Sequence, residues 1–167
     1  MTELLSHPVS CLEHLKAYLG GEGVAYTVDE HPSRYTAQEL AQIEHVSGRL
    51  IAKVVMLIVD GKPVMVAVPG VAKVNFAAVQ KALAAKDVRL ALENEFEHLF
   101  PDCEVGAMPP FGNLYGVPVL VDEALTRDPV ILFNAGTHGR TITMTYADYA
   151  RLVRPAIGAF GKEPVGV

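Results

Sequence analysis

The chain has 167 residues, a length that fits one domain and allows roughly 70% of the unfolded surface to be buried. Half of its residues are hydrophobic and a fifth are charged, which excludes a disordered chain and indicates a globular one. The 14 basic and 19 acidic residues give a net charge of −5. This balance argues against broad binding of nucleic acid, DNA included, but leaves room for a contact with one RNA end.

The cysteines and the apolar segments bear on where the protein works. Cys11 and Cys103 could pair, but two thiols in a chain without a recognisable signal peptide are more simply interpreted as reduced. No apolar run approaches the roughly 20 residues that a helix needs to span a bilayer. We therefore expect a cytoplasmic protein that makes no contact with a membrane.

The first third of the chain predicts two helices and a strand. Apolar residues at three-to-four-residue spacing predict a helix over residues 10–21, which a pair of glycines ends. A strand is predicted at residues 24–28. The capping-box pattern of residues 36–39 predicts the start of a second, short helix.

A β-hairpin is the next predicted element. Residues 53–59 and residues 63–68 are two apolar runs rich in β-branched side chains. Asp60 and Gly61 lie between them and are typical of a two-residue hairpin turn. The hydrophobicity of both runs indicates a hairpin that is buried on at least one face.

The rest of the chain alternates helices and strands around one irregular segment. Asn75 can cap a helix that continues through residue 83. Residues 106–112 are rich in glycine and proline, so they can neither continue a helix nor lie in a central strand. Further helices are predicted at residues 93–99 and 146–153, and strands at residues 117–121, 130–133 and 141–144. Because no repeat or linker interrupts this pattern, we predict a single α/β (α+β) domain over residues 1–167.

Several common catalytic motifs are absent from the sequence. None of the four serines lies in a Gly-x-Ser-x-Gly motif, and there is no Cys-x-x-Cys or His-Glu-x-x-His pattern. The six histidines are scattered, and no glycine motif for a nucleotide is present. The sequence therefore gives little support to a side-chain nucleophile, a metal centre or a cofactor, and we expect none of them.

Three features could carry chemistry, and each also has a purely structural interpretation. Lys53 opens a buried strand, where it could reach out to water or place a cation at the rim of a pocket. The segment 106–112 could consist of ordinary turns, or it could be a rigid loop whose backbone faces a ligand. Gly106 in particular could permit close approach of a substrate or simply adopt a positive φ. Finally, Gly136 and His138 could form a plain hairpin turn or place an imidazole beside a substrate.

The order of these features along the chain is more specific than any one of them. Lys53 is followed by Ala-Val-Pro-Gly at residues 67–70, by Gly-x-x-x-Pro from Gly106, by Val-Asp, and by Ala-Gly-Thr-His ending at His138. In this order the chain resembles the YbaK/EbsC-type aminoacyl-tRNA deacylases. That family includes the editing domain that is inserted in, or stands apart from, prolyl-tRNA synthetase. The resemblance extends over about residues 10–155 and looks like a stand-alone bacterial branch.

The resemblance implies a fold, a reaction and a set of site residues. The fold would be a YbaK-like compact domain with a mixed, barrel-like β-sheet flanked by helices. The reaction would be hydrolysis of the ester in mischarged tRNA, acting on the tRNA 3′ end, with Lys53, Gly106 and His138 in catalytic positions. The expected substrate-binding residues are Pro110 and Gly136, which match the family's motifs, together with Met108, Phe111 and Thr137.

An aminoacyl ester is already activated, which makes the missing nucleophile less surprising. Such a site needs a positioned water, an acceptor for its proton and donors for the oxyanion. The resemblance suggests that the terminal ribose hydroxyl of the RNA assists. Two other functions stay open: a non-catalytic module that binds a tRNA end or an aminoacyl-tRNA synthetase, and a hydrolase of small acylated metabolites.

Overall fold

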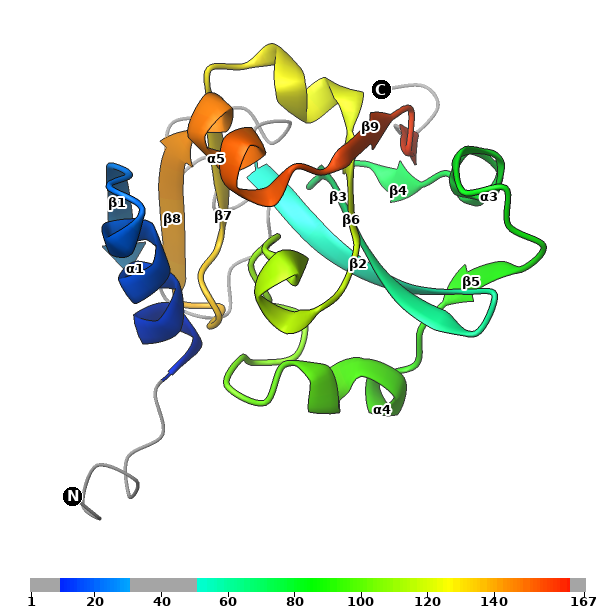
Figure 1. The fold of residues 1–167 in the computed structure, drawn as a ribbon, viewed down its shortest axis with the longest axis horizontal. Coiled ribbons are helices and arrows are strands. Elements are labelled where there is room, and N and C mark those ends of the chain that lie inside the picture. Colours follow the sequence, from blue (N-terminus) through cyan, green and yellow to red (C-terminus); the bar gives the residue numbers. More distant parts are fainter. Residues whose placement is uncertain (1–9, 31–50, 163–167) are drawn as a thin grey trace.

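The computed structural model describes residues 10–30 and 51–162 of the chain. Helices are interspersed among runs of strands along this length (Figure 1). The helices are α1 (Cys11–Gly21), α3 (Phe76–Ala82), α4 (Glu93–Phe96) and α5 (Tyr146–Val153), with 3₁₀ turns at η2 (Glu97–Leu99), η3 (Gly112–Tyr115) and η4 (Glu123–Arg127). The strands are β1 (Tyr26–Glu30), β2 (Ile51–Val59), β3 (Lys62–Pro69), β4 (Lys73–Val74), β5 (Val88–Leu90), β6 (Val119–Asp122), β7 (Val130–Asn134), β8 (Arg140–Thr145), β9 (Ala156–Gly158) and β10 (Gly161–Lys162).

The main sheet is mixed, as the family resemblance implied. Its strands follow the order β1-β8-β7-β2-β3-β6-β9, and β5 pairs with β2 outside this path. The β2–β3, β7–β8 and β1–β8 pairs are antiparallel, whereas β2–β7, β3–β6 and β6–β9 are parallel. Within the described residues no pairing joins β1 to β9, so the hydrogen-bonded path stays open at these two strands. The prediction of one α+β domain with a mixed sheet and flanking helices is confirmed.

Both faces of the central strands are buried, which explains their continuous apolar sequence. On β3, Met65 and Ala67 pack into a cluster with α1, α5 and the segment 96–117. The intervening Val66 and Val68 pack into a second cluster with α3 and Phe160. In Figure 1, α1, β1 and β8 lie at one end of the molecule, and α3, β4 and β5 lie at the other.

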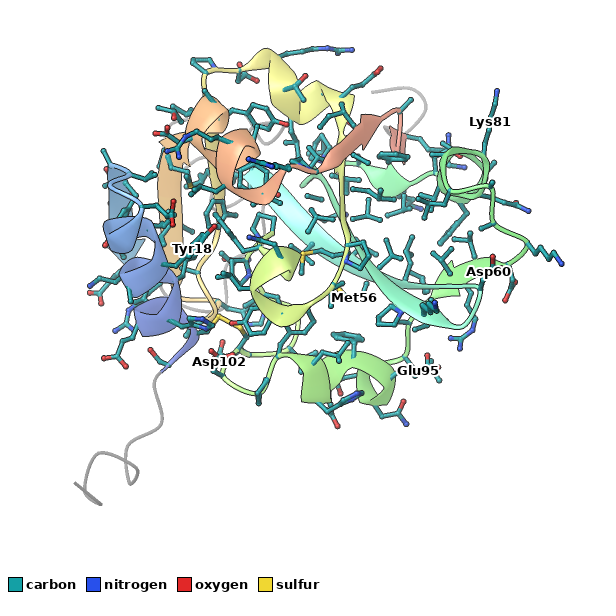
Figure 2. All side chains as sticks on the ribbon, viewed as in Figure 1. Tyr18, Met56, Asp60, Lys81, Glu95 and Asp102 are labelled. Carbon is teal, nitrogen blue, oxygen red and sulfur yellow. A yellow bond between two sulfur atoms is a disulfide. The ribbon has the colours of Figure 1, made fainter. Side chains whose placement is uncertain are left out.

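The predicted hairpin is confirmed, and its turn has the expected geometry. Asp60 and Gly61 both have positive φ, 49° and 84°, as the common two-residue hairpin turn requires. The Asp60 carboxylate also accepts the backbone N–H groups of Lys86 (3.0 Å) and Asp87 (2.8 Å). The turn therefore joins the hairpin to the segment that leads into β5, and Asp60 is labelled there in Figure 2.

The helix boundaries follow their caps closely. Ser10 and Glu13 form a reciprocal capping box at the start of α1, and Asn75 caps α3 through the backbone N–H of Ala78. The strand predicted at residues 24–28 begins two residues later, because the N–H of Val24 instead donates to the Leu19 carbonyl and closes the turn after α1. The helix predicted to start within residues 36–39 lies outside the described residues.

The two cysteines correct an expectation, because Cys11 and Cys103 form a disulfide. The backbone N–H of Cys11 donates to the Asp102 carbonyl at 2.9 Å, so the fold places the start of α1 directly on the loop that carries Cys103 (Figure 2). The two residues are 92 positions apart, and no local pattern signals such a contact. Among the helices of the described ranges, none combines the length and apolar character that a bilayer span requires.

Candidate functional site

Backbone hydrogen bonds bring the glycine-proline loop against the turn that follows β7. The N–H of Glu104 donates to the carbonyl of Gly136 at 2.8 Å, and the N–H of Gly136 donates to the carbonyl of Ala107 at 2.9 Å. These two bonds run in opposite directions between the same short segments. Two motifs that are thirty residues apart in the sequence therefore meet at one place, which we call the loop corner (residues 104–107 and 136–138).

Glu104 and Gly106 flank the imidazole of His138 at the loop corner. Glu104 Oε1 accepts the backbone N–H of His138 at 2.9 Å and lies 3.2 Å from its Nδ1. The other ring nitrogen faces Gly106, since a Cβ atom on this glycine would lie 3.4 Å from His138 Nε2. Both side chains are about half exposed, at 41% for His138 and 54% for Glu104. A reactant at this surface can therefore reach the imidazole.

The positive φ that the sequence allowed for Gly106 is observed. Its φ is +87°, so the position requires a conformation that side chains rarely adopt. It is also exposed beside the imidazole, where a Cβ would make an ordinary van der Waals contact with His138. Replacement of Gly106 is therefore expected to strain the backbone.

Gly136 is fixed by packing from the opposite side of the loop corner. It is buried, and its φ is +92°. A Cβ at this position would collide with the Cβ of Cys11 and would lie 2.6 Å from its sulfur. The glycine is therefore required because the start of α1 packs directly against the turn that leads to His138.

A polar cluster surrounds the disulfide that lies behind Gly136. The Tyr115 hydroxyl donates to Asp102 at 3.0 Å, and His14 Nδ1 lies 3.3 Å from the same carboxylate. Burial raises the pKa of Tyr115 well above its ordinary value, and the adjacent Asp102 charge adds to this effect. The hydroxyl therefore stays protonated and continues to donate.

The same cluster resembles a metal site only in composition. Cys11, Asp102 and Cys103 bring potential ligand atoms within 4.8 Å of one another. Their sulfurs are bonded to each other and cannot serve as thiolate ligands, and the Tyr115 hydroxyl lies 3.4 Å from the Cys103 sulfur. In this state the cluster links α1 to the loop corner.

The remaining residues of the glycine-proline loop lie beneath the corner. Met108, Pro110 and Phe111 are buried, and the Tyr149 hydroxyl donates to the Pro110 carbonyl at 2.7 Å. The Phe111 ring is fully buried and packs edge-to-face against Tyr149. These residues hold the loop from the core side. Thr137 is half-buried within the turn, and its carbonyl accepts the N–H of Arg140 at 3.5 Å.

Lys53 lies in a different place, on the opposite face of β2. Its neighbour Val54 packs towards the cluster that contains Met108 and Phe111, whereas Val55, which shares the face of Lys53, packs towards the other cluster. The structure thus brings Gly106, Gly136 and His138 together and places Lys53 in a separate hollow.

That hollow, which we call the lysine hollow, has a volume of about 350 Å³. It is lined by Lys53, Val55, Lys73, Val74, Phe76, Leu90 and Lys162, so the described residues contribute three cations, an apolar floor and no carboxylate. Burial lowers the pKa of Lys53, and the nearby charge of Lys73 lowers it further. The hollow is therefore a place where an anion would be stabilised.

One buried acceptor lies on the strand next to Lys53. Ala52 pairs with Phe133 in the parallel β2–β7 ladder, so Lys53 and Asn134 each follow a member of that pair. Within the described part of the chain, Asn134 Oδ1 is buried and has no hydrogen-bond partner. A buried acceptor without a donor is unusual.

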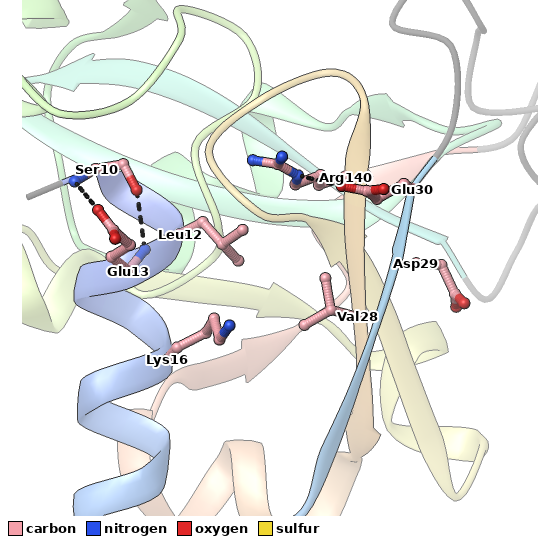
Figure 3. Close-up of a pocket in the computed structure, with 8 residues that line it drawn as sticks. All are labelled: Ser10, Leu12, Glu13, Lys16, Val28, Asp29, Glu30 and Arg140. Carbon is pink, nitrogen blue, oxygen red and sulfur yellow. Dashed lines mark hydrogen bonds and ion pairs between the residues drawn. The ribbon is translucent and has the colours of Figure 1, made fainter.

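A wider hollow of about 720 Å³ lies between α1 and β1. Figure 3 shows Leu12, Lys16 and Val28 pointing into the space between these elements, whereas Asp29 points away. Arg140 is held by Glu30 at 3.1 Å at one end of this hollow. Its lining mixes acidic and basic residues, so it offers an anion less than the lysine hollow does.

Neither Glu104 nor the partners of Lys53 were identified from the sequence. A glutamate two residues before a glycine is ordinary in a polar loop, and nothing local connects it with a histidine 34 positions away. Lys73 and Lys162 come from the short strands β4 and β10, which pair with each other although they are far apart in the sequence.

Comparisons with known proteins agree with the motifs. Residues 31–152 match the family model of the aminoacyl-tRNA editing domain. A proline–tRNA ligase of Leuconostoc citreum (strain KM20) is 34% identical over 92 residues, which cover 55% of this chain and only 16% of that enzyme.

Solved structures share the fold at low sequence identity. A proposed trans-editing enzyme for prolyl tRNA synthetase has a TM-score of 0.81 and 20% identity, over 93% of this chain and 99% of the other. The hypothetical protein APE2540 has a TM-score of 0.79 and 19% identity, over 89% of this chain and 99% of the other. The family expected from the order of the motifs is thus confirmed: the chain belongs to the aminoacyl-tRNA editing domain family.

Proposed function

We propose that the protein is a trans-editing deacylase that hydrolyses the ester at the 3′ end of mischarged tRNA. The observation that carries this proposal is the meeting of Gly106 and His138 at an accessible loop corner, in a chain of the editing-domain family. The protein would act in the cytoplasm, where tRNAs are charged, either alone or beside an aminoacyl-tRNA synthetase.

The loop corner provides what hydrolysis of an activated ester needs. A water bound between His138 Nε2 and the ester lies where its proton can be accepted. The absence of a side chain at Gly106 lets the terminal ribose and the aminoacyl group approach the backbone closely. The neighbouring ribose hydroxyl then orients the water, so no side-chain nucleophile is required.

The lysine hollow provides the contact with RNA. The whole chain is acidic, yet three of its lysines gather in one hollow. Ammonium groups bind phosphate strongly when they are partly desolvated, and Phe76 and Leu90 offer apolar surface to a base or ribose. Lys53 would hold a phosphate near the 3′ end while the ester reaches the loop corner.

Selection of the amino acid would follow from size. One methylene is worth only about 1–3 kcal/mol in a hydrophobic pocket, whereas a residue too large to enter is excluded by collision. Gly136 and Thr137 would form the wall beside the aminoacyl group, and Met108, Pro110 and Phe111 would set its shape from beneath.

A panel of substrates tests the reaction class. Purified protein is incubated with tRNAs mischarged with different amino acids and, in parallel, with small aminoacyl esters. We expect deacylation of at least one mischarged tRNA at a rate well above its spontaneous hydrolysis. Activity on free esters alone would favour a metabolite hydrolase, and binding of tRNA without any turnover would favour the non-catalytic module.

A substitution of Lys53 tests the RNA contact. Loss of a charge-assisted contact of about 1.5–3 kcal/mol predicts that Lys53→Ala lowers deacylation roughly tenfold to 150-fold. The fold should persist, because the side chain lines a hollow rather than the core. Lys81→Ala is the matched control, since Lys81 is exposed on α3 and extends away from the molecule (Figure 2). Full turnover by a folded Lys53→Ala protein would remove Lys53 from the site.

A further inference from the structure

We propose that Glu104 is a positioning residue that makes His138 the proton acceptor for the attacking water. This inference rests on the proposed deacylase function and adds to it a carboxylate that neither the motifs nor the family comparison identified. It concerns which nitrogen of the His138 imidazole carries the hydrogen and how the ring is oriented, and it follows from the contacts at the loop corner.

A single carboxylate oxygen fixes both the backbone and the ring of His138. Glu104 Oε1 accepts the backbone N–H at 2.9 Å, and the same oxygen lies 3.2 Å from Nδ1. A carboxylate can only accept, so Nδ1 must carry the hydrogen in this contact. In the neutral imidazole the lone pair is then left on Nε2, the nitrogen that faces Gly106.

The backbone of Glu104 is itself held on both sides. Its N–H donates to the Gly136 carbonyl at 2.8 Å, and its carbonyl accepts the N–H of Ala107 at 3.0 Å. The segment that carries the Glu104 carboxylate is therefore hydrogen-bonded both to the turn before His138 and to the loop after Gly106. Movement of Glu104 would disturb both segments of the loop corner.

Stability alone is a poor explanation for this contact. Both side chains are about half exposed, and exposed ion pairs contribute little to the free energy of unfolding. Orientation of a ring for proton transfer, by contrast, depends on a carboxylate at this distance. The geometry therefore fits a role in the reaction better than a role in folding.

The proposed step conserves atoms and protons. The oxygen of water forms a bond to the ester carbonyl carbon while one of its protons moves to His138 Nε2. The bond between that carbon and the ribose oxygen then breaks, and the ribose oxygen takes the proton from Nε2. The products are the free amino acid and the 3′ end of the tRNA, and Glu104 exchanges no proton.

The chain contains a second histidine–carboxylate pair that serves as a control. His14 Nδ1 lies 3.3 Å from Asp102, but that carboxylate is also engaged by Tyr115 behind the disulfide. His14 is 41% exposed, much like His138, yet no glycine loop faces it in the described structure. His14→Gln should therefore leave deacylation unchanged.

The test combines kinetics with the tautomer of His138. Deacylation of the mischarged tRNA is measured as kcat and KM for wild type, Glu104→Ala, Glu104→Gln and His14→Gln. Long-range ¹H–¹⁵N spectra report which nitrogen of His138 carries the hydrogen. Rates are counted per folded molecule, so a loss of stability in Glu104→Ala does not hide the result.

We expect Glu104→Ala to lower kcat about 10- to 100-fold with little change in KM, because misorientation of a catalytic group costs rate rather than binding. The preference for hydrogen on Nδ1 should weaken in the same variant. Glu104→Gln should retain more activity than Glu104→Ala, since the backbone N–H of His138 holds the amide oxygen in the place of Oε1.

The failures of the two proposals are distinguishable. A wild-type protein that deacylates no mischarged tRNA would remove the proposed function and this inference together. A wild-type protein that is active while folded Glu104→Ala keeps its kcat and its Nδ1–H tautomer would overturn the inference alone. Equal losses in the alanine and glutamine variants with the tautomer intact in both would also overturn it.

Discussion

The loop corner and the lysine hollow are built in opposite ways. The corner consists of irregular segments that are joined by backbone hydrogen bonds, by the Glu104–His138 contact and by a disulfide packed behind Gly136. The hollow consists of side chains carried mainly by regular strands, with lysines from β2, β4 and β10.

This difference matches the tolerance of the two kinds of chemistry. Proton transfer loses rate steeply when groups move by an ångström, so its residues must be held tightly. Attraction between an ammonium and a phosphate falls only gradually with distance, so flexible lysines on a rigid sheet suffice. Substitutions at the corner should therefore disturb geometry and stability, and substitutions in the hollow should change charge while the fold persists.

The largest expected effect concerns the disulfide. Its two cysteines are 92 residues apart, and a cross-link over a loop of about that length stabilises the folded state by roughly 4–5 kcal/mol in the chain-entropy model. Reduction with a dithiol should lower the urea midpoint of the wild-type protein by a corresponding amount. Cys103→Ala should unfold at the lower midpoint whether or not the dithiol is present. If the urea midpoint of the wild-type protein did not change when the dithiol is added, the stability of the fold would not depend on this cross-link.

A smaller effect is expected for Gly136→Ala. The positive φ and the collision with Cys11 should together lower the free energy of unfolding by about 3 kcal/mol. Gly116 is the matched control, because its φ is +72° and a Cβ there would meet open space. Gly116→Ala should cost about 1 kcal/mol, from backbone strain alone. If denaturant titrations gave equal losses for both variants, close packing of α1 on the corner would not be what requires glycine at position 136.

The smallest effect concerns the charges in the hollow. Because burial and the Lys73 charge lower the pKa of Lys53, this lysine loses its proton at a lower pH than an ordinary lysine, and RNA binding should weaken as the pH rises through that value. Lys73→Met removes the charge of Lys73 and so raises the pKa of Lys53. The loss of RNA binding should therefore begin at a higher pH. Near neutrality the variant should bind uncharged tRNA a few-fold more weakly, since one cation is lost from the hollow.

The measurement is the dissociation constant for uncharged tRNA between neutral and alkaline pH. Lys162 contributes the third charge of the hollow and is left unchanged. Lys81→Met is the control for loss of an exposed cation that does not line the hollow, and it should leave the pH dependence as in the wild type. Superimposable pH curves for wild type and Lys73→Met would exclude coupling between Lys53 and Lys73.

The sequence by itself determined the local structure of this protein. Asn75 marks a helix start because its side chain accepts the backbone N–H group three residues later. Asp60 and Gly61 mark the hairpin because both tolerate positive φ. The order of the lysine, glycine-proline and histidine motifs identified the family, since the order of motifs is preserved along a chain whatever the packing is.

Only the tertiary structure decided which of these motifs meet. Lys53 lies apart from Gly106 and His138, although the motif order grouped all three, because side chains alternate between the two faces of β2. Phe111 is a core residue because its loop folds onto α5, and the hydrophobic character of a phenylalanine does not distinguish a core from a pocket. The Cys11–Cys103 and Glu104–His138 contacts join segments 92 and 34 residues apart. Such contacts depend on how whole elements pack against one another, and no local pattern of residues predicts which distant segments will meet.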